Sequence, residues 1–456
     1  MSSKIDLETY IDNIEYSSDR VKDIITVEHR LNNKKRDFLF VDRVQGKHIP
    51  VEPHKVDELV SELACKVSSC IPGHHSVLVI GFCETATALG EILASKISCC
   101  DYYMQTTREQ IDQEKLFNFS EEHSHATEQL VYVNPEDKEE YHMKTFDTIV
   151  FVDDEISTGK TIVNFVNALK QHDLVKDTVK YIVASICNWQ DDKNKQLFIE
   201  NNITGVSLIQ GQLKDASVKM NVESVVDGET DLYDSADELD GTEDHETGDH
   251  EIVIDDVPFN LFLYNRCGHA CEDDWSVSNY FAKMAFEAIM NDLSNSGIDK
   301  QSAEKLKIDI IGTEEFMHVP IITGEALERV TKDVTFHATT RSPIDICRES
   351  IELNNNDIKK GIMHRYKIHS AYDKDRVNYI YNLYKADRVY VITDSLDVTD
   401  RFKQDIIQAV KLAGCNEVKI ISFKPDNVQD KDSIQDKDSI QNKNSIQNKD
   451  SIQEED

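Results

Sequence analysis

The sequence predicts an α/β protein with two units, each built on a mainly parallel sheet. The chain has 456 residues, which is too long for one compact core. Apolar strand patterns alternate with helical patterns every twenty-odd residues, as they do in parallel sheets with helical crossovers. A long acidic stretch without Lys or Arg separates two such series. We therefore expect two folded domains joined by a linker.

The first series of elements begins at residue 37. Apolar residues recur at helical spacing from Val56 to Val67 and predict a helix over 56–71. A second helix should end near residue 97, and a third should span 162–170. Runs of apolar residues predict strands at 37–44, 75–82, 102–105, 130–134, 146–152 and 179–187.

The second series begins at residue 257. Apolar residues at near-helical spacing predict a helix over 277–293, and Gly414 should end another helix over 406–412. Strands are predicted at 307–312, 336–340, 389–393 and 418–423.

Changes in composition set the predicted domain limits. We expect an N-terminal arm at 1–34, a first α/β domain at 35–213, an acidic linker at 214–256, a second α/β domain at 257–425 and a tail at 426–456. The tail repeats Lys-Asp-Ser-Ile-Gln with a period of six residues, which matches no helix face and offers one Ile per repeat for a core. Low hydrophobicity predicts that the linker and the tail are disordered.

The net charge of −35 is concentrated in part of the chain. Fifteen acidic residues lie in 221–256, so the ordered remainder is only moderately acidic, which argues against binding to nucleic acid. No stretch approaches eighteen consecutive apolar residues, and the N-terminus lacks a signal-peptide core. Ten cysteines in so long a chain are typical of reduced thiols. We expect a soluble cytoplasmic protein that binds neither nucleic acid nor membranes.

Residues 148–161 contain the strongest signal, Thr-Ile-Val-Phe-Val-Asp-Asp-Glu-Ile-Ser-Thr-Gly-Lys-Thr. A buried-strand pattern ends in two adjacent acids, Asp153 and Asp154, and a polar turn leads into a helix. Carboxylates suit ribose hydroxyls or a hydrated Mg²⁺, whereas N–H groups at a helix start, with hydroxyls beside them, suit a phosphate. The segment therefore predicts a site for a phosphorylated sugar. An ordinary helix cap is the alternative, because Asp, Ser and Thr are common there.

The end of the same segment, Gly159-Lys160-Thr161, also matches the end of a Walker A loop. That loop requires a glycine five residues before the glycine of the Gly-Lys pair. Asp154 occupies this position, and its carboxylate would repel a triphosphate. The sequence therefore excludes a P-loop.

The turn after the second predicted strand, Gly81-Phe-Cys-Glu-Thr-Ala-Thr-Ala-Leu-Gly90, leads into a helix. Its small and hydroxyl residues permit a close approach of the backbone to an anion. Glu84 is unusual there, because an acid beside an anion needs Mg²⁺ or a neighbouring cation. Packing and helix capping explain the same residues, so this turn alone identifies no ligand.

Three further groups of residues are candidates for chemistry. Arg108, after a short strand, could clamp a diphosphate with two parallel hydrogen bonds. His123 and His125 alternate and could share one face of an extended segment as acid–base groups, metal ligands or solvated residues. Cys267 and Cys271 have a spacing that permits metal ligation but lack a partner cluster.

The second domain has its own group of polar residues at predicted strand ends. Thr340, Arg341 and Ser342 follow one strand, and ligands bind at such ends in open α/β sheets. Glu314 and Glu315 follow another strand. Together they predict a second-domain pocket. The alternative is that Arg341 and Glu314 pair with each other inside the domain.

The order of these motifs resembles the phosphoribosyltransferase-like family of bacterial tellurium-resistance and stress-response gene clusters. The resemblance implies a type I phosphoribosyltransferase fold, a Rossmann-like and mainly parallel sheet, followed by a domain called TRSP. In the first domain it rests on residues 81–90, Thr106-Thr-Arg108, Glu121-Glu-His-Ser-His-Ala126, Val152–Thr161, Arg36-Asp-Phe-Leu-Phe-Val41 and Gly46-Lys-His-Ile-Pro50. In the second domain it rests on Gly312-Thr-Glu-Glu-Phe-Met317 and Thr339-Thr-Arg-Ser-Pro343.

The resemblance also implies a site for phosphoribosyl diphosphate (PRPP). Asp153 and Asp154 would face the ribose 2′- and 3′-hydroxyls, and Arg108 would meet the diphosphate with Mg²⁺. His123 and His125 would act in the segment that closes over the site. The 5′-phosphate would bind Ser157, Thr158, Gly159, Lys160 and Thr161, and the diphosphate would bind Glu84, Thr85, Ala86 and Thr87.

One departure from the family pattern concerns the acceptor. Purine-salvage phosphoribosyltransferases often carry an Asp where this chain has Ser157, and that Asp contacts the base. Hypoxanthine or guanine salvage is therefore not supported. An orotate-like or unusual acceptor stays open.

The expected function is a Mg²⁺-dependent transfer of the phosphoribosyl group from PRPP to an acceptor, giving a nucleotide-like product in a stress or tellurium-resistance pathway. The alternatives are a non-catalytic sensor of PRPP or a nucleotide, and a hydrolase of a nucleotide-like compound. The expected partners are small molecules, PRPP and the acceptor, and a homodimer is compatible with the sequence.

Overall fold

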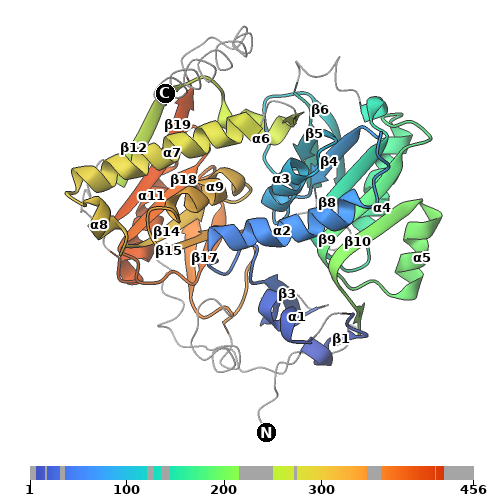
Figure 1. The fold of residues 1–456 in the computed structure, drawn as a ribbon, viewed down its shortest axis with the longest axis horizontal. Helices are drawn as coiled ribbons and strands as arrows, with labels where there is room; N and C mark the ends of the chain where they lie inside the picture. Colours follow the sequence, from blue (N-terminus) through green and yellow to red (C-terminus); the bar gives the residue numbers. More distant parts are fainter. Residues whose placement is uncertain are drawn as a thin grey trace, which may run out of the picture.

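The computed structural model describes residues 7–15, 18–30, 36–120, 128–134, 143–214, 250–271, 275–346, 361–415 and 417–425. Two units lie side by side, each around a mainly parallel sheet, which confirms the predicted fold class (Figure 1). The disorder predicted for residues 215–249 and for the tail concerns residues outside the described ranges. Among the described residues, no helix combines the length and the apolar character needed to cross a membrane.

The first unit contains a six-stranded sheet in the order β10-β9-β8-β4-β5-β13, in which only β13 runs antiparallel to its neighbour. The central strand β4 is buried at every position, as parallel strands covered on both faces usually are. The strands are β4 (Val77–Gly81), β5 (Cys100–Gln105), β8 (Thr148–Ile156), β9 (Lys180–Asn188), β10 (Ile203–Gln210) and β13 (His269–Ala270). The helices are α2 (Pro53–Ser68), α3 (Thr87–Lys96), α4 (Lys160–Gln171) and α5 (Asp192–Glu200).

Two small antiparallel hairpins complete the first unit. β2 (Ile25–His29) pairs with β3 (Phe38–Asp42), and β6 (Lys115–Ser120) pairs with β7 (Glu128–Tyr132). The short 3-10 helix η2 (Met143–Thr145) leads into β8.

The second unit contains a five-stranded parallel sheet in the order β12-β19-β18-β14-β15. Successive residues of β14 alternate between its faces: Ile310 packs in the core with helices α7 and α9, and Ile311 packs in the core with α11. The strands are β12 (Glu251–Val257), β14 (Lys307–Gly312), β15 (Asp333–Ala338), β18 (Arg388–Thr393) and β19 (Val418–Pro425), with a hairpin of β16 (Arg365–His369) and β17 (Val377–Tyr381). The helices are α7 (Trp275–Asn295), α8 (Lys300–Ala303), α9 (His318–Leu327) and α11 (Asp400–Leu412).

Residues 7–30, which the sequence assigned to an N-terminal arm, belong to the folded body. Besides β2, they form η1 (Leu7–Thr9), β1 (Ile11–Asp12) and α1 (Ser18–Ile24), and β1 pairs with β11 (Gln212–Leu213). Val21, Ile25 and Val27 are buried in the main core. The segment looked polar because these buried residues are interspersed with charged ones.

The boundary between linker and second domain also needs correction. Residues 251–256, assigned to the acidic linker, lie in β12, which pairs with β19 at the edge of the second sheet. Charged residues are common on edge strands, where they discourage pairing with other chains, so composition alone did not separate this strand from a linker. Residues 261–271 then form α6 (Leu261–Cys267) and β13, and β13 extends the first sheet.

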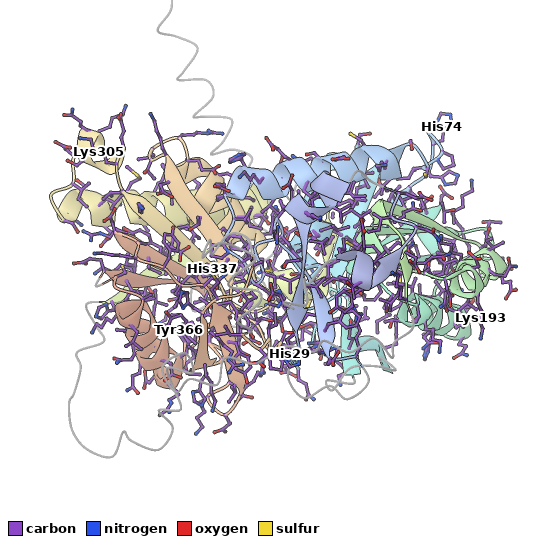
Figure 2. All side chains as sticks on the ribbon, turned by 90° about the horizontal axis from the view of Figure 1, so that it is seen from below. His29, His74, Lys193, Lys305, His337 and Tyr366 are labelled. Carbon is purple, nitrogen blue, oxygen red and sulfur yellow. The ribbon has the colours of Figure 1, made fainter. Side chains whose placement is uncertain are left out.

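Several contacts join the two units. Val51 and Phe336 exchange backbone hydrogen bonds of 3.0 and 2.8 Å, and Arg30 forms a β-bridge with Ile344. His29 Nδ1 lies 3.0 Å from Asp345 Oδ2, and Figure 2 shows His29 between the ribbons of the two units. The units therefore share an interface that is fixed by backbone and side-chain bonds.

Candidate functional site

A cavity of about 660 Å³ lies where the two units meet, at the carboxyl ends of β4 and β8. Ligands bind at such ends in parallel α/β sheets. The volume lies within the usual range for sites of small molecules. The predicted site residues among its lining are Glu84, Thr85, Arg108, Asp153, Asp154, Ser157, Thr161, Thr340, Arg341 and Ser342.

Strand β8 carries both predicted acids into this cavity. It extends to Ile156, beyond the predicted end at residue 152, so Asp153 and Asp154 lie within the strand. Both side chains are half-buried, and the Asp154 N–H donates to Asp153 Oδ1 at 3.0 Å. Burial raises the pKa of Asp154, although hydrogen bonds with Asp153 and Thr85 oppose the rise.

A second cavity of about 270 Å³ lies against the hydroxyl-rich turn after β8. Ser157, Thr158, Gly159 and Thr161 line it, and helix α4 begins directly after Gly159. Arg30 and Arg108 also line this cavity. Asp153 and Glu155 line the same cavity, so the two cations offset two carboxylates. The hydroxyls and the first turn of a twelve-residue helix are the features that suit an anion. Lys160, which was also predicted to bind the phosphate, has an exposed side chain.

Gly159 determines the shape of this turn. It has a φ of 72°, in the region that favours glycine, and a Cβ atom there would collide with the Phe198 ring and come within 2.7 Å of Gln190 Nε2. We expect Gly159→Ala to lower the melting temperature, because strain of about 1–2 kcal/mol adds to the collision. Differential scanning calorimetry would measure this. Replacing Gly73, which has open space around its Cβ position and no positive φ, should change the melting temperature little.

Glu84 lies in a ring of cations. Lys47 Nζ lies 2.8 Å from Glu84 Oε1, and Arg341 Nε and Arg108 NH1 lie 3.6 and 3.9 Å from Glu84 Oε2. Burial alone would raise the pKa of Glu84, but Lys47, Arg341 and Arg108 lower it to about 2. The neighbouring cation that an acid in this turn requires is therefore present in the protein itself.

The rest of the predicted diphosphate turn has a structural role. Thr85 lines the large cavity, whereas Ala86 and Thr87 are fully buried. The Thr87 hydroxyl donates to the carbonyl oxygen of Glu315 at 2.8 Å. Ala86 and Thr87 are therefore not part of the cavity lining, and Thr87 contacts the second unit instead.

The second-domain residues lie at the same site as the first-domain ones. Thr340, Arg341 and Ser342 line the large cavity beside Asp153 and Asp154, so they do not form a separate pocket. Glu314 and Glu315 are buried and are not among the described residues that line the cavity.

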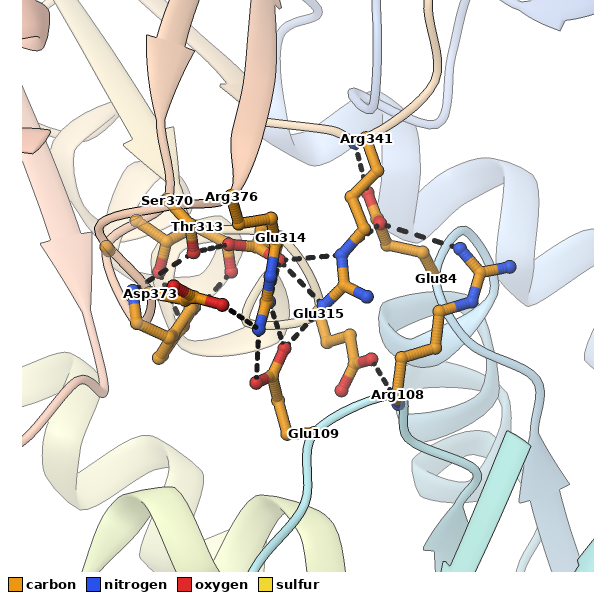
Figure 3. A network of polar contacts seen from close by, with 12 residues as sticks. Glu84, Arg108, Glu109, Thr313, Glu314, Glu315, Arg341, Ser370, Asp373 and Arg376 are labelled. Atoms are coloured by element: carbon orange, nitrogen blue, oxygen red, sulfur yellow. Dashed lines mark hydrogen bonds and ion pairs between the residues drawn. The ribbon is translucent and has the colours of Figure 1, made fainter. Parts of the chain in front are cut away.

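Arg341 pairs with acids from both units (Figure 3). Its Nε donates to Glu314 Oε2 at 2.9 Å, as the structural alternative predicted. It also pairs with Glu84 and Glu109, which belong to the first unit. Burial disfavours its charge, but Glu314, Glu84, Glu315 and Glu109 raise the pKa of Arg341 above its usual value. Arg341 therefore pairs with Glu314 inside the second domain and also lines the large cavity.

The ion-pair network continues away from the cavity. Arg376 NH2 donates to Glu109 Oε2 and Arg376 NH1 to Glu314 Oε2, both at 2.9 Å (Figure 3). Glu315 accepts from the Thr107 hydroxyl at 2.6 Å and from the Arg108 N–H at 2.9 Å. The position of Arg108 in the cavity thus depends on an acid of the second unit.

The remaining candidates gain no support from the geometry. His123 and His125 lie outside the described residues. Cys271 Sγ lies 3.2 Å from Cys100 Sγ, so Cys271 is turned toward β5. Within the described ranges, no group of three or more His, Cys, Asp or Glu side chains could hold a metal ion.

Several residues of the cavity were given no role in the site from the sequence. Arg30, Arg36, Lys47 and Glu155 supply charges, and Asp42, Gln45 and His48 supply further polar groups. Lys47 and His48 could have been identified as candidate site residues, because they follow a predicted strand and a glycine.

The fold and the cavity together define the class of protein. A parallel sheet with two acids at the end of a central strand, followed by a hydroxyl-rich turn and a helix, is the arrangement expected of a type I phosphoribosyltransferase domain. Residues 24–212 match the family described as phosphoribosyl transferase, and residues 280–410 match the TRSP domain that lies C-terminal to it. The chain belongs to the proteins that combine these two domains.

Solved structures similar to part of the chain include adenine phosphoribosyltransferases. The one from Rhodothermus marinus is 11% identical, with a TM-score of 0.29, and the match covers 42% of this chain and 97% of that one. Those from Trypanosoma brucei and Leishmania donovani are each 12% identical, with a TM-score of 0.29. The match covers 42% of this chain and 78% of the Trypanosoma brucei protein. For the Leishmania donovani protein it covers 45% of this chain and 85% of that one. No curated protein matches the chain.

Proposed function

We propose that the protein transfers the phosphoribosyl group of PRPP to an acceptor bound in the cavity between its two domains, giving a nucleotide-like product. One observation carries this proposal: Asp153 and Arg108 each line both the large cavity and the smaller one at the Ser157–Thr161 turn. Carboxylates for ribose hydroxyls thus adjoin a cradle for a monoester, as a ribose 5-phosphate requires.

The charges of the large cavity suit the remaining part of PRPP. Arg108 and Arg341 lie on either side of Glu84 and would face the diphosphate at C1′. Negative charge grows on the diphosphate as the C1′–O bond breaks, and cations that are already in place stabilise it without reorganisation. Because Arg341 comes from the TRSP domain, that domain would complete the transferase site.

The residues present also fit Mg²⁺ bound together with PRPP. Mg²⁺ usually keeps several waters and binds through one or two carboxylates and the phosphates of the substrate. Asp153 and Asp154 would be those carboxylates, and Mg²⁺ would supply charge for the diphosphate. The lack of a three-ligand cluster among the described residues is compatible with this mode of binding.

We expect the double substitution Asp153→Asn and Asp154→Asn to abolish binding of PRPP with Mg²⁺, because both charged hydroxyl acceptors are lost. Isothermal titration calorimetry would measure the binding. Asp147→Asn is the matched control: Asp147 precedes β8 at the opposite end of the same strand and pairs with Lys176. Equal binding by wild type and the double variant would contradict the proposal.

A second measurement separates transfer from the other functions of such a site. Pyrophosphate release that requires both PRPP and a base indicates transfer. Ribose 5-phosphate release without a base indicates a hydrolase, and PRPP binding without either product indicates a sensor.

A further inference from the structure

The smaller cavity at the Ser157–Thr161 turn takes its cations from outside the turn. The turn contributes hydroxyls and the start of α4. Its one lysine, Lys160, has an exposed side chain and is not among the described residues that line the cavity. The two arginines of the lining, Arg30 and Arg108, come from other segments. A guanidinium forms strong, charge-assisted hydrogen bonds with phosphate oxygens, so either arginine could add to the binding of a phosphate.

Only one of these two arginines has an acid as an ion-pair partner. Arg108 NH1 lies 3.9 Å from Glu84 Oε2, at the turn assigned to the diphosphate, and the Arg108 N–H donates to Glu315 Oε1 at 2.9 Å. The guanidinium of Arg30 forms no ion pair and no hydrogen bond with any residue that the structure describes. Arg30 is therefore the cation of the smaller cavity that is available to a ligand.

The charge of Arg30 lies at the cavity wall. Burial and the nearby charge of Arg36 lower the pKa of Arg30, whereas the charge of Glu155 raises it. Arg36 and Glu155 line the large cavity, so the guanidinium that interacts with them lies at the same wall. Glu155 already has a cation, because Arg36 NH1 lies 3.0 Å from Glu155 Oε1. An anion in the smaller cavity would balance the charge of Arg30.

Contacts with both units fix the backbone of Arg30. Its N–H donates to the carbonyl oxygen of Asp37 at 2.8 Å, and it forms an antiparallel β-bridge with Ile344 of the second unit. The carbonyl oxygen of the preceding residue, His29, accepts from the Asp345 N–H at 2.9 Å. A residue that is held in place before the ligand arrives loses less conformational freedom on binding.

We propose that Arg30 binds the 5′-phosphate of PRPP together with the Ser157–Thr161 turn. The inference rests on the proposed phosphoribosyl transfer and adds a binding residue to it. The planar guanidinium of Arg30 donates two parallel hydrogen bonds to phosphate oxygens, and the turn donates its N–H and O–H groups. The second domain then acts at both ends of PRPP. It supplies Arg341 to the diphosphate end, and Ile344 holds the backbone of Arg30 at the phosphate end.

The test measures the binding of three probes to the full chain by isothermal titration calorimetry. PRPP with Mg²⁺ probes the whole site, ribose 5-phosphate probes the phosphate end, and pyrophosphate with Mg²⁺ probes the other end. We expect Arg30→Met to weaken the binding of PRPP and of ribose 5-phosphate by about 10–100-fold, as expected for one lost hydrogen-bonding contact between charged groups. Its binding of pyrophosphate should equal that of wild type.

Two variants serve as controls. Arg30→Lys keeps the charge but loses the planar fork, so its affinity for ribose 5-phosphate should lie between those of wild type and Arg30→Met. Arg329→Met removes an exposed arginine that lines neither cavity and should bind all three probes like wild type. Arg30→Met loses no ion pair with a described residue, so it should fold, and its melting temperature checks this.

Each outcome supports or overturns the inference. Equal PRPP binding by wild type and Arg30→Met overturns the role of Arg30 and leaves the proposed transfer intact. The role is also overturned if Arg30→Met weakens pyrophosphate binding as much as ribose 5-phosphate binding, if Arg30→Lys binds as weakly as Arg30→Met, or if wild type binds PRPP but not ribose 5-phosphate. Failure of wild type to bind PRPP overturns the proposed function and, with it, this inference.

Discussion

Replacing Arg341 by methionine is expected to destabilise the protein by about 3–5 kcal/mol, the usual cost of removing one partner from a buried ion-pair network. The substitution leaves Glu84, Glu109 and Glu314 without a cation that now lies between them. These acids come from both units, so the interface between the units should weaken. Thermal unfolding would measure the effect, which is on the order of 10 °C.

The stability of this variant should depend on pH, because the acids that Arg341 contacts lose a cation. The pKa of Glu84 is lowered to about 2 and that of Glu109 is also lowered, so their pairs stabilise the wild type above the unfolded value near 4.5. The contribution of Glu84 is lost as pH falls through about 2, and that of Glu109 is lost as pH falls through its own lowered pKa. Without Arg341 both pKa values rise, although Lys47 and Arg108 still pair with Glu84 and Arg376 with Glu109. Protonation of the acids then removes the negative charge that Arg341 no longer balances. The difference in melting temperature between wild type and Arg341→Met should therefore shrink between pH 7 and pH 4.

Two controls separate charge from geometry. Arg341→Lys keeps the charge but loses the fork that reaches several acids, so its loss of stability should be intermediate. Arg388→Met removes an arginine of the same unit whose partner Glu417 is largely exposed, at 3.7 Å, and should cost much less. Equal melting temperatures for Arg341→Met and Arg388→Met would show that the network contributes no net stability.

Local sequence patterns predicted most elements of both sheets. Strands β4, β9, β14 and β18 have apolar runs that identify them without reference to the rest of the chain. Helix α5 and strand β10 follow the last strand predicted for the first domain and were missed. Strand β10 exposes Thr204 and Gly205, and α5 buries only Phe198, so neither has a strong apolar pattern.

The parts of the candidate site that are formed by residues consecutive in the sequence could be predicted. The acids of β8 and the turn after them are consecutive in the chain, so their spacing carried the information. The ring of cations around Glu84 was not predictable in this way. Lys47, Arg108 and Arg341 come from three distant segments, and only the folded interface brings them within 4 Å of one carboxylate.

Arg266 connects the same interface to the second sheet and gives the other large expected effect. It is 1% exposed, lies 2.5 Å from Asp394 Oδ2 and 3.8 Å from Glu315 Oε2, and stacks 4.0 Å from the centre of the Phe262 ring. Burial disfavours its charge, but Asp394, Tyr372 and Glu315 raise the pKa of Arg266 above its usual value. Arg266→Met should therefore cost about 3–5 kcal/mol, because two buried acids lose their cation.

A double-mutant cycle measures this pair directly. Asn265 Nδ2 and the Tyr372 hydroxyl donate to Asp394 at 3.0 and 2.5 Å. Asp394→Asn removes the charge, keeps one acceptor oxygen for Asn265 and places an NH₂ group against the Tyr372 hydroxyl, which can accept as well as donate. The combination with Arg266→Met should be more stable than the sum of the single losses predicts, by about 1–3 kcal/mol, because neither charge is then left unpaired. Glu315 keeps its bonds from Thr107 and Arg108 throughout. Strictly additive losses in urea unfolding would mean that the charge of Arg266 acts on Glu315 and its surroundings instead of on Asp394.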